Sequence, residues 1–467
     1  MTMHSRTNRA TWRTAGLLSL ALLASACSNI KDQLLAPQQP NVISPNDIQS
    51  ATGADGLYVG AIGRFTVALN GSPTNSGSNQ EAAWNWAGLF TDEFKSSDTF
   101  SQRNDADQRN LQDNDALVTQ IWAGLQQGRG YARTALQALQ KFEPASTAKI
   151  GEMYFDIGFL ELTLGQEFCN GIPLGFTVGG QPQYTAPLTT QQVFVTAGTH
   201  LDSAIASLGT ATDAASNAVR NAATIAKARD LVDQAQYAAA AALVTAIPTS
   251  FQFNVNYSNT TVDNEWWVLG PSVKRYSLGD SIDVSGPVLN ATPFVSLKDP
   301  RVLVDRAVSG VNGQDNSTIF NWPSVLSGRD APLPIATGID ARLIEAEAKL
   351  QAGDYAGMVA TLNALRGTSQ TIGTFVVPVL PPITTVPATK DDAINLLFRE
   401  KALWQFGRGV RMDDLRRLVR QYGRPQNQVF PSGTFFKTGT YGTEVAFPVP
   451  DAERTNPLFK GCIDRNA

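Results

Sequence analysis

The segment from Asp391 to Phe459 constrains the fold of this chain more than any other part. It combines a long helical pattern with a short proline-containing loop near the end of the chain. After the first helix, carboxylates and guanidinium groups recur about three residues apart, a spacing at which they can pair on one face of a helix. We expect them to lock this pair of helices to the last loop, with ligand contact as the alternative. These residues are Arg411, Asp414, Arg416 and Arg417.

The same segment resembles the C-terminal signature of the SusD/RagB family, in which Gly-x-Arg-x-x-Asp-Leu-Arg-Arg precedes Pro-x-Pro-x-x-Glu and Asn-Pro. The family usually has an acidic residue just before that glycine, where this chain has Arg408. The resemblance implies a mainly α fold, a tetratricopeptide-like helical-repeat scaffold with a loop-rich, partly β excursion. The matching residues are Gly409, Arg411, Asp414, Leu415, Arg416, Arg417, Pro448, Pro450, Glu453, Asn456 and Pro457.

A second segment predicts how the helices pair. Residues 341–366 carry alanines at helical spacing on both sides of Gly353 and Asp354, which form the expected turn. Small residues let two antiparallel helices approach closely and stack on the next pair, as in a tetratricopeptide unit. Residues 114–142 also have apolar residues at helical spacing, with a break expected from Gly128 to Gly130.

Two stretches interrupt the helical pattern, at about residues 70–112 and 248–336. Both are rich in Gly, Ser, Asn, Asp and Pro with interleaved aromatic residues. The second is too long for an unstructured linker inside a compact domain, so we expect an ordered, functional excursion. Short strands are predicted at residues 255–257 and 261–268. The whole of residues 44–467 is predicted to be one domain that contains both excursions.

The first 26 residues have the pattern of a lipoprotein signal peptide. Three arginines precede an apolar run from Ala15 to Ala24, too short for a permanent membrane span but suited to a cleaved secretion signal. Cys27 follows small residues, as in a bacterial lipobox, and we expect it to be acylated and to anchor the protein. An ordinary signal peptide cut near Ala26 is the alternative. Residues 27–43 are polar and contain proline, which suits a tether.

Two further cysteines, Cys169 and Cys462, remain once Cys27 carries lipid. An even pair in an exported protein favours a disulfide, because the compartments outside the cytosol permit one. Two unrelated buried thiols are the alternative.

The sequence lacks the motifs of a catalytic or metal centre. His200 is the only histidine after the signal, so neither a Ser-His-Asp triad nor a histidine-rich zinc site is expected. Phosphate-binding glycine loops and the nucleophile elbow do not occur, and no basic stripe suggests nucleic acid. We therefore expect no enzyme activity, no cofactor and no metal. A secreted glycosidase is the disfavoured alternative, with carboxylates at Asp92, Glu93, Asp263 and Glu265.

Aromatic residues in the two excursions give the strongest indication of a binding site. Sugar rings stack on aromatic side chains while their hydroxyls need polar partners, so a sugar site mixes the two. The alternative is that these rings cover the core, where only one of Trp266 and Trp267 can point inward if they lie on a strand. The expected ligand contacts are Trp84, Trp86, Trp266, Trp267, Tyr276 and Trp322, with Asn85, Asp92, Asn264 and Arg275 as polar partners.

The resemblance implies a function in nutrient uptake. SusD-like proteins are lipid-anchored at the surface of the outer membrane, where they capture a glycan or another bulky nutrient. They deliver it to a TonB-dependent, SusC-like transporter without bond chemistry. The alternative is a protein-interaction adaptor that uses the helical repeats and binds no small ligand.

Overall fold

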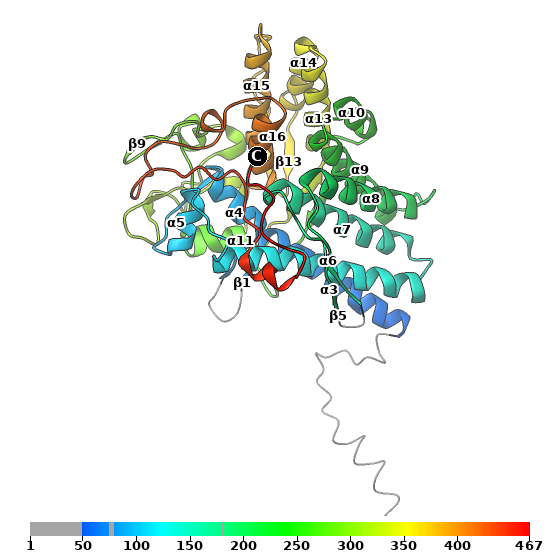
Figure 1. Cartoon of the computed structure of the whole chain (residues 1–467). Coiled ribbons are helices and arrows are strands. Elements are labelled where there is room, and N and C mark those ends of the chain that lie inside the picture. The colour runs from blue at the N-terminus through cyan, green and yellow to red at the C-terminus, as the bar shows by residue number, and fades with distance from the viewer. Residues whose placement is uncertain (1–48, 74–78, 179–180) are drawn as a thin grey trace, which may run out of the picture.

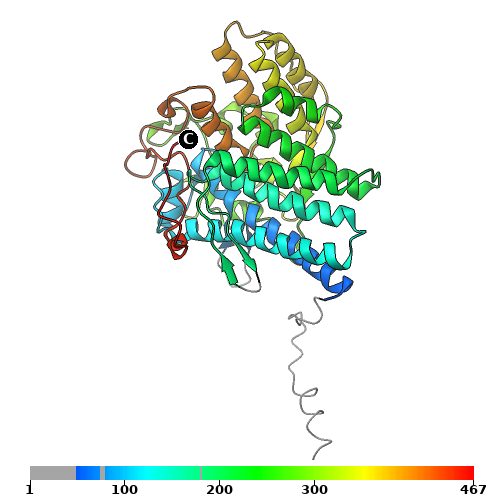
Figure 2. The ribbon, with the colours of Figure 1, turned by 45° about the vertical axis from the view of Figure 1, so that its right-hand side comes forward.

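Long helices form the scaffold of this chain, of which the computed structural model describes residues 49–73, 79–178 and 181–467. The helices are α3 (Ala51–Asn70), α6 (Ala116–Phe142), α7 (Thr147–Glu167), α8 (Thr190–Ser207), α9 (Ala214–Asp233), α10 (Tyr237–Val244), α13 (Gly338–Gln351), α14 (Tyr355–Arg366), α15 (Lys390–Trp404) and α16 (Val410–Arg420). Helices α3, α6, α7, α8 and α9 lie side by side in that order (Figures 1 and 2). The series continues through α10 to α13, which also packs against α14 and α15. The predicted mainly α scaffold is confirmed.

The pair of α13 and α14 has the predicted repeat geometry. Helix α13 begins with a capping box, in which Thr337 Oγ1 accepts a hydrogen bond from Asp340 N and the Asp340 carboxylate accepts one from Thr337 N. Gly353 makes the turn with φ of +77°, a conformation that favours glycine. Asp354 then caps α14 by accepting a hydrogen bond from Gly357 N at 2.8 Å. Local capping and turn residues therefore specify both helix ends.

Helix α6 continues through Gly128 and Gly130, so the predicted break is wrong. Gly128 lies where α6 approaches its neighbours, since a Cβ atom there would lie 2.8 Å from Leu160 Cδ1 and 3.5 Å from Ala68 Cβ. Close helix packing, and not a turn, explains the glycine at this position. A Cβ atom at Gly130 would meet nothing within 4 Å, because this residue lies on the exposed side of the helix.

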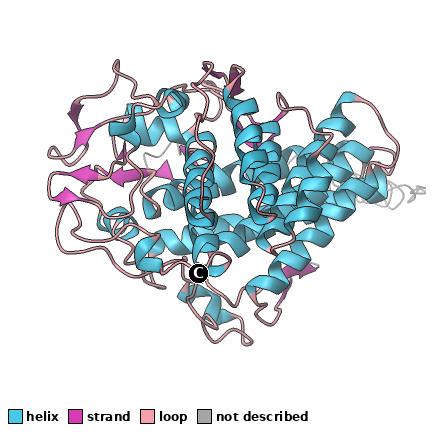
Figure 3. Ribbon diagram, turned by 90° about the horizontal axis from the view of Figure 1, so that it is seen from above, coloured by secondary structure: helices cyan, strands magenta, loops and turns pink. Residues whose placement is uncertain are grey.

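The two excursions form a lobe of short elements beside the long helices, seen at one side of Figure 3. The lobe contains α4 (Ala83–Phe90), α5 (Ser101–Asp107), α11 (Glu265–Trp267), α12 (Phe294–Leu297), the π-helical turn η1 (Val268–Ser272), and the 3-10 turns η2 (Pro300–Val302) and η3 (Ser324–Leu326). Its strands are β1 (Ser72–Pro73), β2 (Asn79–Gln80), β3 (Phe94–Ser96), β6 (Gln252–Val255), β7 (Tyr276–Leu278), β8 (Ile282–Asp283), β9 (Gly286–Pro287), β10 (Val311–Asn312), β11 (Ile319–Phe320) and β12 (Leu333–Thr337).

Short antiparallel pairs join the two excursions. Strand β3 of the first pairs with β7 of the second, and β6 and β12 pair at the two ends of the second. The predicted strand at 261–268 is wrong, because residues 265–267 form α11. The strand predicted at 255–257 overlaps β6 only at Val255, where β6 ends. Outside the lobe lie β4 (Phe176–Val178), β5 (Gln181–Gln183), β13 (Gln370–Ile372), β14 (Phe375–Val377), η4 (Gln426–Gln428) and η5 (Asp451–Thr455).

A disulfide joins the end of α7 to the last residues of the chain, as predicted. The Cα atoms of Cys169 and Cys462 are 6.0 Å apart. Backbone hydrogen bonds support the junction, since Cys169 N donates to Phe447 O at 2.8 Å and Ile463 N donates to Asn170 O at 2.8 Å. The closing segment is thereby fixed beside α6 and α7.

The predicted signal peptide (1–26), Cys27 and the tether (27–43) lie outside the described residues. The domain limits also stay a prediction. Within the described ranges, no helix is both long enough and apolar enough to span a membrane.

Candidate functional site

The aromatic residues predicted to bind a ligand form the core of the loop-rich lobe instead. At most 2% of the surface is exposed in five of the six residues: Trp84, Trp86, Trp266, Tyr276 and Trp322. The ring of Phe94 lies among them, with its centroid 4.4 Å from that of Trp266 and 5.4 Å from that of Trp322. A ligand cannot stack on a ring that is already buried. The prediction of ligand contact is therefore wrong for these five residues, and the alternative of a core role applies.

The family signature and the buried tryptophans belong to one packing unit. Gly409 has φ of +69°, and a Cβ atom there would lie 2.0 Å from Trp84 Cδ1. Trp266 Nε1 donates a hydrogen bond to Gly407 O at 3.0 Å. The turn between α15 and α16 thus packs directly on the aromatic core, which explains why glycine is needed in the signature.

Two predicted contacts lie nearer the surface, and both already have protein partners. Trp267 is half-buried, with the guanidinium of Arg329 5.1 Å from its ring centroid. Arg275 is half-buried, with Nε 3.6 Å from Asp98 Oδ2. Trp266 points inward and Trp267 lies nearer the surface, but the element is a helical turn and not the strand on which the expectation rested.

The predicted polar partners are buried in the same lobe. Asn85 Oδ1 accepts a hydrogen bond from Ala82 N at 2.9 Å, and Asn264 Oδ1 accepts one from Trp266 N at 3.0 Å. Burial raises the pKa of Asp92 to about 7, although the charges of Arg411 and Arg109 act in the opposite direction. Asn85 and Asn264 support the backbone of the lobe and Asp92 is buried in it, so the prediction that Asn85 and Asp92 contact a ligand is also wrong.

The remaining carboxylates considered for glycoside cleavage do not form an open pair. Glu93 and Glu265 are buried, and Asp263 is paired with Arg329 at 2.8 Å. His200 Nδ1 lies 2.7 Å from Glu161 Oε2, so the histidine joins α8 to α7. Among the residues that the structure describes, no group of three or more metal-ligating side chains is placed to hold a metal ion.

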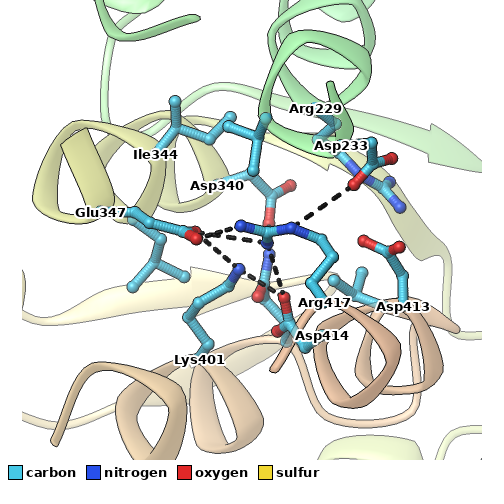
Figure 4. Close-up of a pocket in the computed structure, with 13 residues that line it drawn as sticks. Arg229, Asp233, Asp340, Ile344, Glu347, Lys401, Asp413, Asp414 and Arg417 are labelled. Carbon is cyan, nitrogen blue, oxygen red and sulfur yellow. Dashed lines mark hydrogen bonds and ion pairs between the residues drawn. The ribbon is translucent and has the colours of Figure 1, made fainter. Parts of the chain in front are cut away.

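A buried cluster of charges joins α13, α15 and α16 (Figure 4). Glu347 accepts hydrogen bonds from Arg417, from Lys401 at 3.0 Å and from the Tyr422 hydroxyl at 2.6 Å. Asp414 accepts from Lys401 at 2.5 Å and from Arg417 at 3.2 Å. The space inside the cluster is about 20 Å³, room for about one water molecule. This cluster is therefore structural and not a ligand site.

The predicted structural role of the signature residues is confirmed, but their partners differ from those expected. Arg411 Nε donates to Thr91 O at 3.0 Å, and Arg416 Nη1 donates to Gln166 O at 2.6 Å. They hold α16 against α4 and α7 and not against the last loop. Arg408, which stands where the family usually has an acid, pairs with Asp340 at 2.6 Å.

An open groove of about 560 Å³ lies between α6, the β4–β5 hairpin and the C-terminal turn η5; α6 and β5 are labelled in Figure 1. Helix α6 contributes residues spaced three or four apart, which share one face of a helix. The hairpin forms the opposite wall. Four aromatic residues line the groove: Trp122, Tyr131, Phe176 and Tyr184.

The hairpin wall is attached to α6 by several side chains. Gln126 Nε2 donates to Pro173 O at 3.0 Å, and the guanidinium of Arg133 lies 4.2 Å from the ring centroid of Phe176. Arg129, buried behind this wall, pairs with Glu161 at 2.8 Å. These contacts fix the distance between the two walls.

The C-terminal segment completes the groove. Trp122 Nε1 donates a hydrogen bond to Glu453 Oε2 at 3.0 Å, which places the buried indole at the base of the groove. Asn456 Nδ2 donates to Thr185 O at 3.1 Å and so ties the turn to the hairpin. Glu453 and Asn456 of the family signature therefore shape this groove.

Groups on the groove surface are free to bind a ligand. Tyr131 and Tyr184 are 43% and 45% exposed. The side chains of Gln127 and Gln137 make no hydrogen bond to another described residue. Amides offer both donors and acceptors, as sugar hydroxyls do, and aromatic rings offer stacking surfaces. The groove can therefore bind a polyhydroxylated ligand without any chemical step.

The sequence contains a weak signal for this groove. Gln127, Gly130, Thr134 and Gln137 form a polar stripe along a helix whose other face is apolar. Such a stripe is typical of any solvated helix face. Strands β4 and β5, packed over it, turn the stripe into a groove.

No family model and no curated protein matches this sequence. Several solved structures are similar to this chain. A SusD superfamily protein from Bacteroides vulgatus ATCC 8482 has 15% identity and a TM-score of 0.55, over 88% of this chain and 98% of that one. A SusD-like protein from Bacteroides fragilis NCTC 9343 has 12% identity and a TM-score of 0.61, over 90% and 98%.

This chain has the SusD-like fold. The resemblance seen in the C-terminal signature is thereby confirmed for the fold. A third structure with this fold is that of a SusD-like carbohydrate binding protein from Bacteroides vulgatus ATCC 8482, with 11% identity and a TM-score of 0.61, over 88% of this chain and 97% of that one.

We expect Glu347→Ala to lower the free energy of unfolding by about 3 to 5 kcal/mol, because it leaves two buried cations without one of their acceptors. Glu345→Ala is the matched control on the same helix. Glu345 is partly exposed and pairs with Arg342 alone, so its loss should cost less than about 1 kcal/mol. Denaturant unfolding at pH 7 measures both values, and equal costs would contradict the structural role of the cluster.

The same cluster predicts a pH dependence. Burial alone would raise the pKa of Glu347, but the charges of Arg417 and Lys401 outweigh it and lower the pKa from 4.5 to about 2. The stabilisation by Glu347 is therefore complete above pH 4.5 and is lost as the pH falls toward 2. The difference in the free energy of unfolding between wild type and Glu347→Ala, measured by denaturant unfolding, should therefore shrink as the pH falls from 4.5 toward 2.

Proposed function

We propose that this protein binds a glycan, without chemical change, in the groove between α6 and the β4–β5 hairpin. The observation that carries the proposal is the combination, on one open groove, of exposed rings at Tyr131 and Tyr184 with uncommitted amides at Gln127 and Gln137. Ligand sites of this kind are mostly apolar clefts with a few placed polar groups. The groove volume of about 560 Å³ lies within their usual range.

The fold supports the proposal. One protein with this fold is described as carbohydrate binding, and fold alone is an argument by analogy. The chemistry of the groove is independent of that analogy. The two together favour reversible capture of a sugar over catalysis.

We further propose that acylated Cys27 anchors the protein at the outer membrane, and that the protein passes its ligand to a TonB-dependent, SusC-like transporter. The basic start, the apolar run and the small residues before Cys27 support the anchor. The SusD-like fold supports the proposed transfer of the ligand to such a transporter. A helical-repeat adaptor without a small ligand is the second candidate, favoured by the tetratricopeptide-like pair of α13 and α14.

Gly130→Leu separates binding from folding. The new side chain would project into the groove, since a Cβ at this position meets nothing within 4 Å. Leucine should also stabilise α6 by up to about 1 kcal/mol, because glycine is a poor helix former. On a glycan array with residues 28–467, we expect this variant to lose the binding of wild type while its unfolding midpoint stays level or rises.

Gly63→Leu is the matched control. Gly63 is an exposed glycine of α3 with nothing within 4 Å of its Cβ position, and it does not line the groove. It should gain helix stability and keep full binding. Wild-type binding by Gly130→Leu would contradict the groove as the site.

The anchor is tested by Cys27→Ser. Because acylation needs the thiol, we expect the variant to leave the membrane fraction on mild washing while wild type stays bound. Retention equal to that of wild type would contradict the lipid anchor.

A further inference from the structure

Two arginines are held over aromatic rings of the groove and have no acidic partner. The guanidinium of Arg133 lies 4.2 Å from the ring centroid of Phe176, and that of Arg64 lies 5.2 Å from that of Tyr131. Neither forms a hydrogen bond or an ion pair with another residue of the described ranges. Arg129, one helical turn from Arg133, is by contrast buried and paired with Glu161. Arg133, which lines the groove, and Arg64, which lies over one of its rings, are thus both left without a counter-charge in the described part of the chain.

The one carboxylate that lines the groove is already in use. Glu453 accepts hydrogen bonds from Trp122 at 3.0 Å and from Asn456 at 3.3 Å. Because this carboxylate is engaged with the indole and with Asn456, no acid among the described residues that line the groove pairs with either guanidinium. A positive site of this kind stands out on a chain whose formal net charge is −4. An anion entering the groove would therefore meet cations that lack a protein partner.

We propose that the groove takes an acidic sugar, one that carries carboxylate or sulfate groups. This rests on the proposed function and names its ligand class. A guanidinium stacked on a ring is restrained in orientation and keeps its N–H edge for two parallel hydrogen bonds to an oxyanion. The exposed tyrosines stack on the sugar rings, the free glutamines form hydrogen bonds with the hydroxyls, and Arg133 and Arg64 form ion pairs with the acidic groups.

Matched ligands test the proposal. Calorimetry with residues 28–467 compares a uronate trisaccharide, the same trisaccharide with its carboxylates reduced to alcohols, and the reduced form carrying sulfate. We expect both acidic forms to bind at least about fivefold more tightly than the reduced form, the factor for a partly exposed ion pair of about 1 kcal/mol. Raising the salt concentration should narrow the difference, because exposed charges are screened.

Variants locate the effect. Arg133→Gln and Arg64→Gln keep a polar side chain but remove the charge, so each should lower the ratio of the affinity for the acidic forms to the affinity for the reduced form. Arg399→Gln, at an exposed arginine of α15 outside the groove, is the control and should leave this ratio unchanged. If only one of the two acidic forms binds more tightly than the reduced form, that form identifies the acidic group of the ligand as carboxylate or as sulfate.

Equal binding of acidic and reduced sugars would overturn this inference and leave the proposed function standing. A preference for acidic sugars that survives in both Arg133→Gln and Arg64→Gln would also overturn it. If none of the three sugars binds, and the glycan array is blank as well, both the inference and the proposed function fail.

Discussion

Buried guanidinium groups, each with its carboxylate or carbonyl partner, hold the helices of this protein in their arrangement. Arg408 pairs with Asp340, Arg417 with Glu347, and Arg129 with Glu161, and each pair joins two different helices or a helix and a turn. A planar guanidinium donates hydrogen bonds to its partners in a narrow range of geometries, so such a pair specifies which helix faces meet. Removing one partner leaves a charge buried and alone, which is strongly unfavourable. The chain is therefore committed to one arrangement of its helices.

The groove depends on that arrangement. Arg129, held by Glu161, lies behind the hairpin wall, and its Nη1 also donates to Gln126, which binds the backbone of Pro173. The disulfide at Cys169 fixes the chain seven residues before the wall begins at Phe176 and brings the C-terminal turn to its edge. Rigid supports of this kind place the ligand-facing side chains on a helix and a braced hairpin, where stacking and hydrogen-bonding groups keep their spacing.

Local signals in the sequence predict the scaffold well. The alanines around Gly353 indicate a helix pair, and the cysteine count indicates the disulfide. The tryptophans of the excursions mislead, because a sugar site and a small aromatic core use the same residues, and only the packing of Phe94 and Gly409 against them shows which is present. Gly128 misleads in the same way, since sequence cannot distinguish a helix break from close packing. The groove itself lies between α6, strands β4 and β5, and Glu453, which are far apart in the chain.

Amide hydrogen exchange, with and without the oligosaccharide that binds best on a glycan array, tests the central claim that the groove and not the aromatic lobe is the binding site. The account predicts slower exchange on ligand binding in α6, around Gln127 to Gln137, and in the hairpin strands β4 and β5, with no change in α4 or around Trp266. Slower exchange confined to α4 and to residues 263–278, with none in α6 or the hairpin, would contradict it.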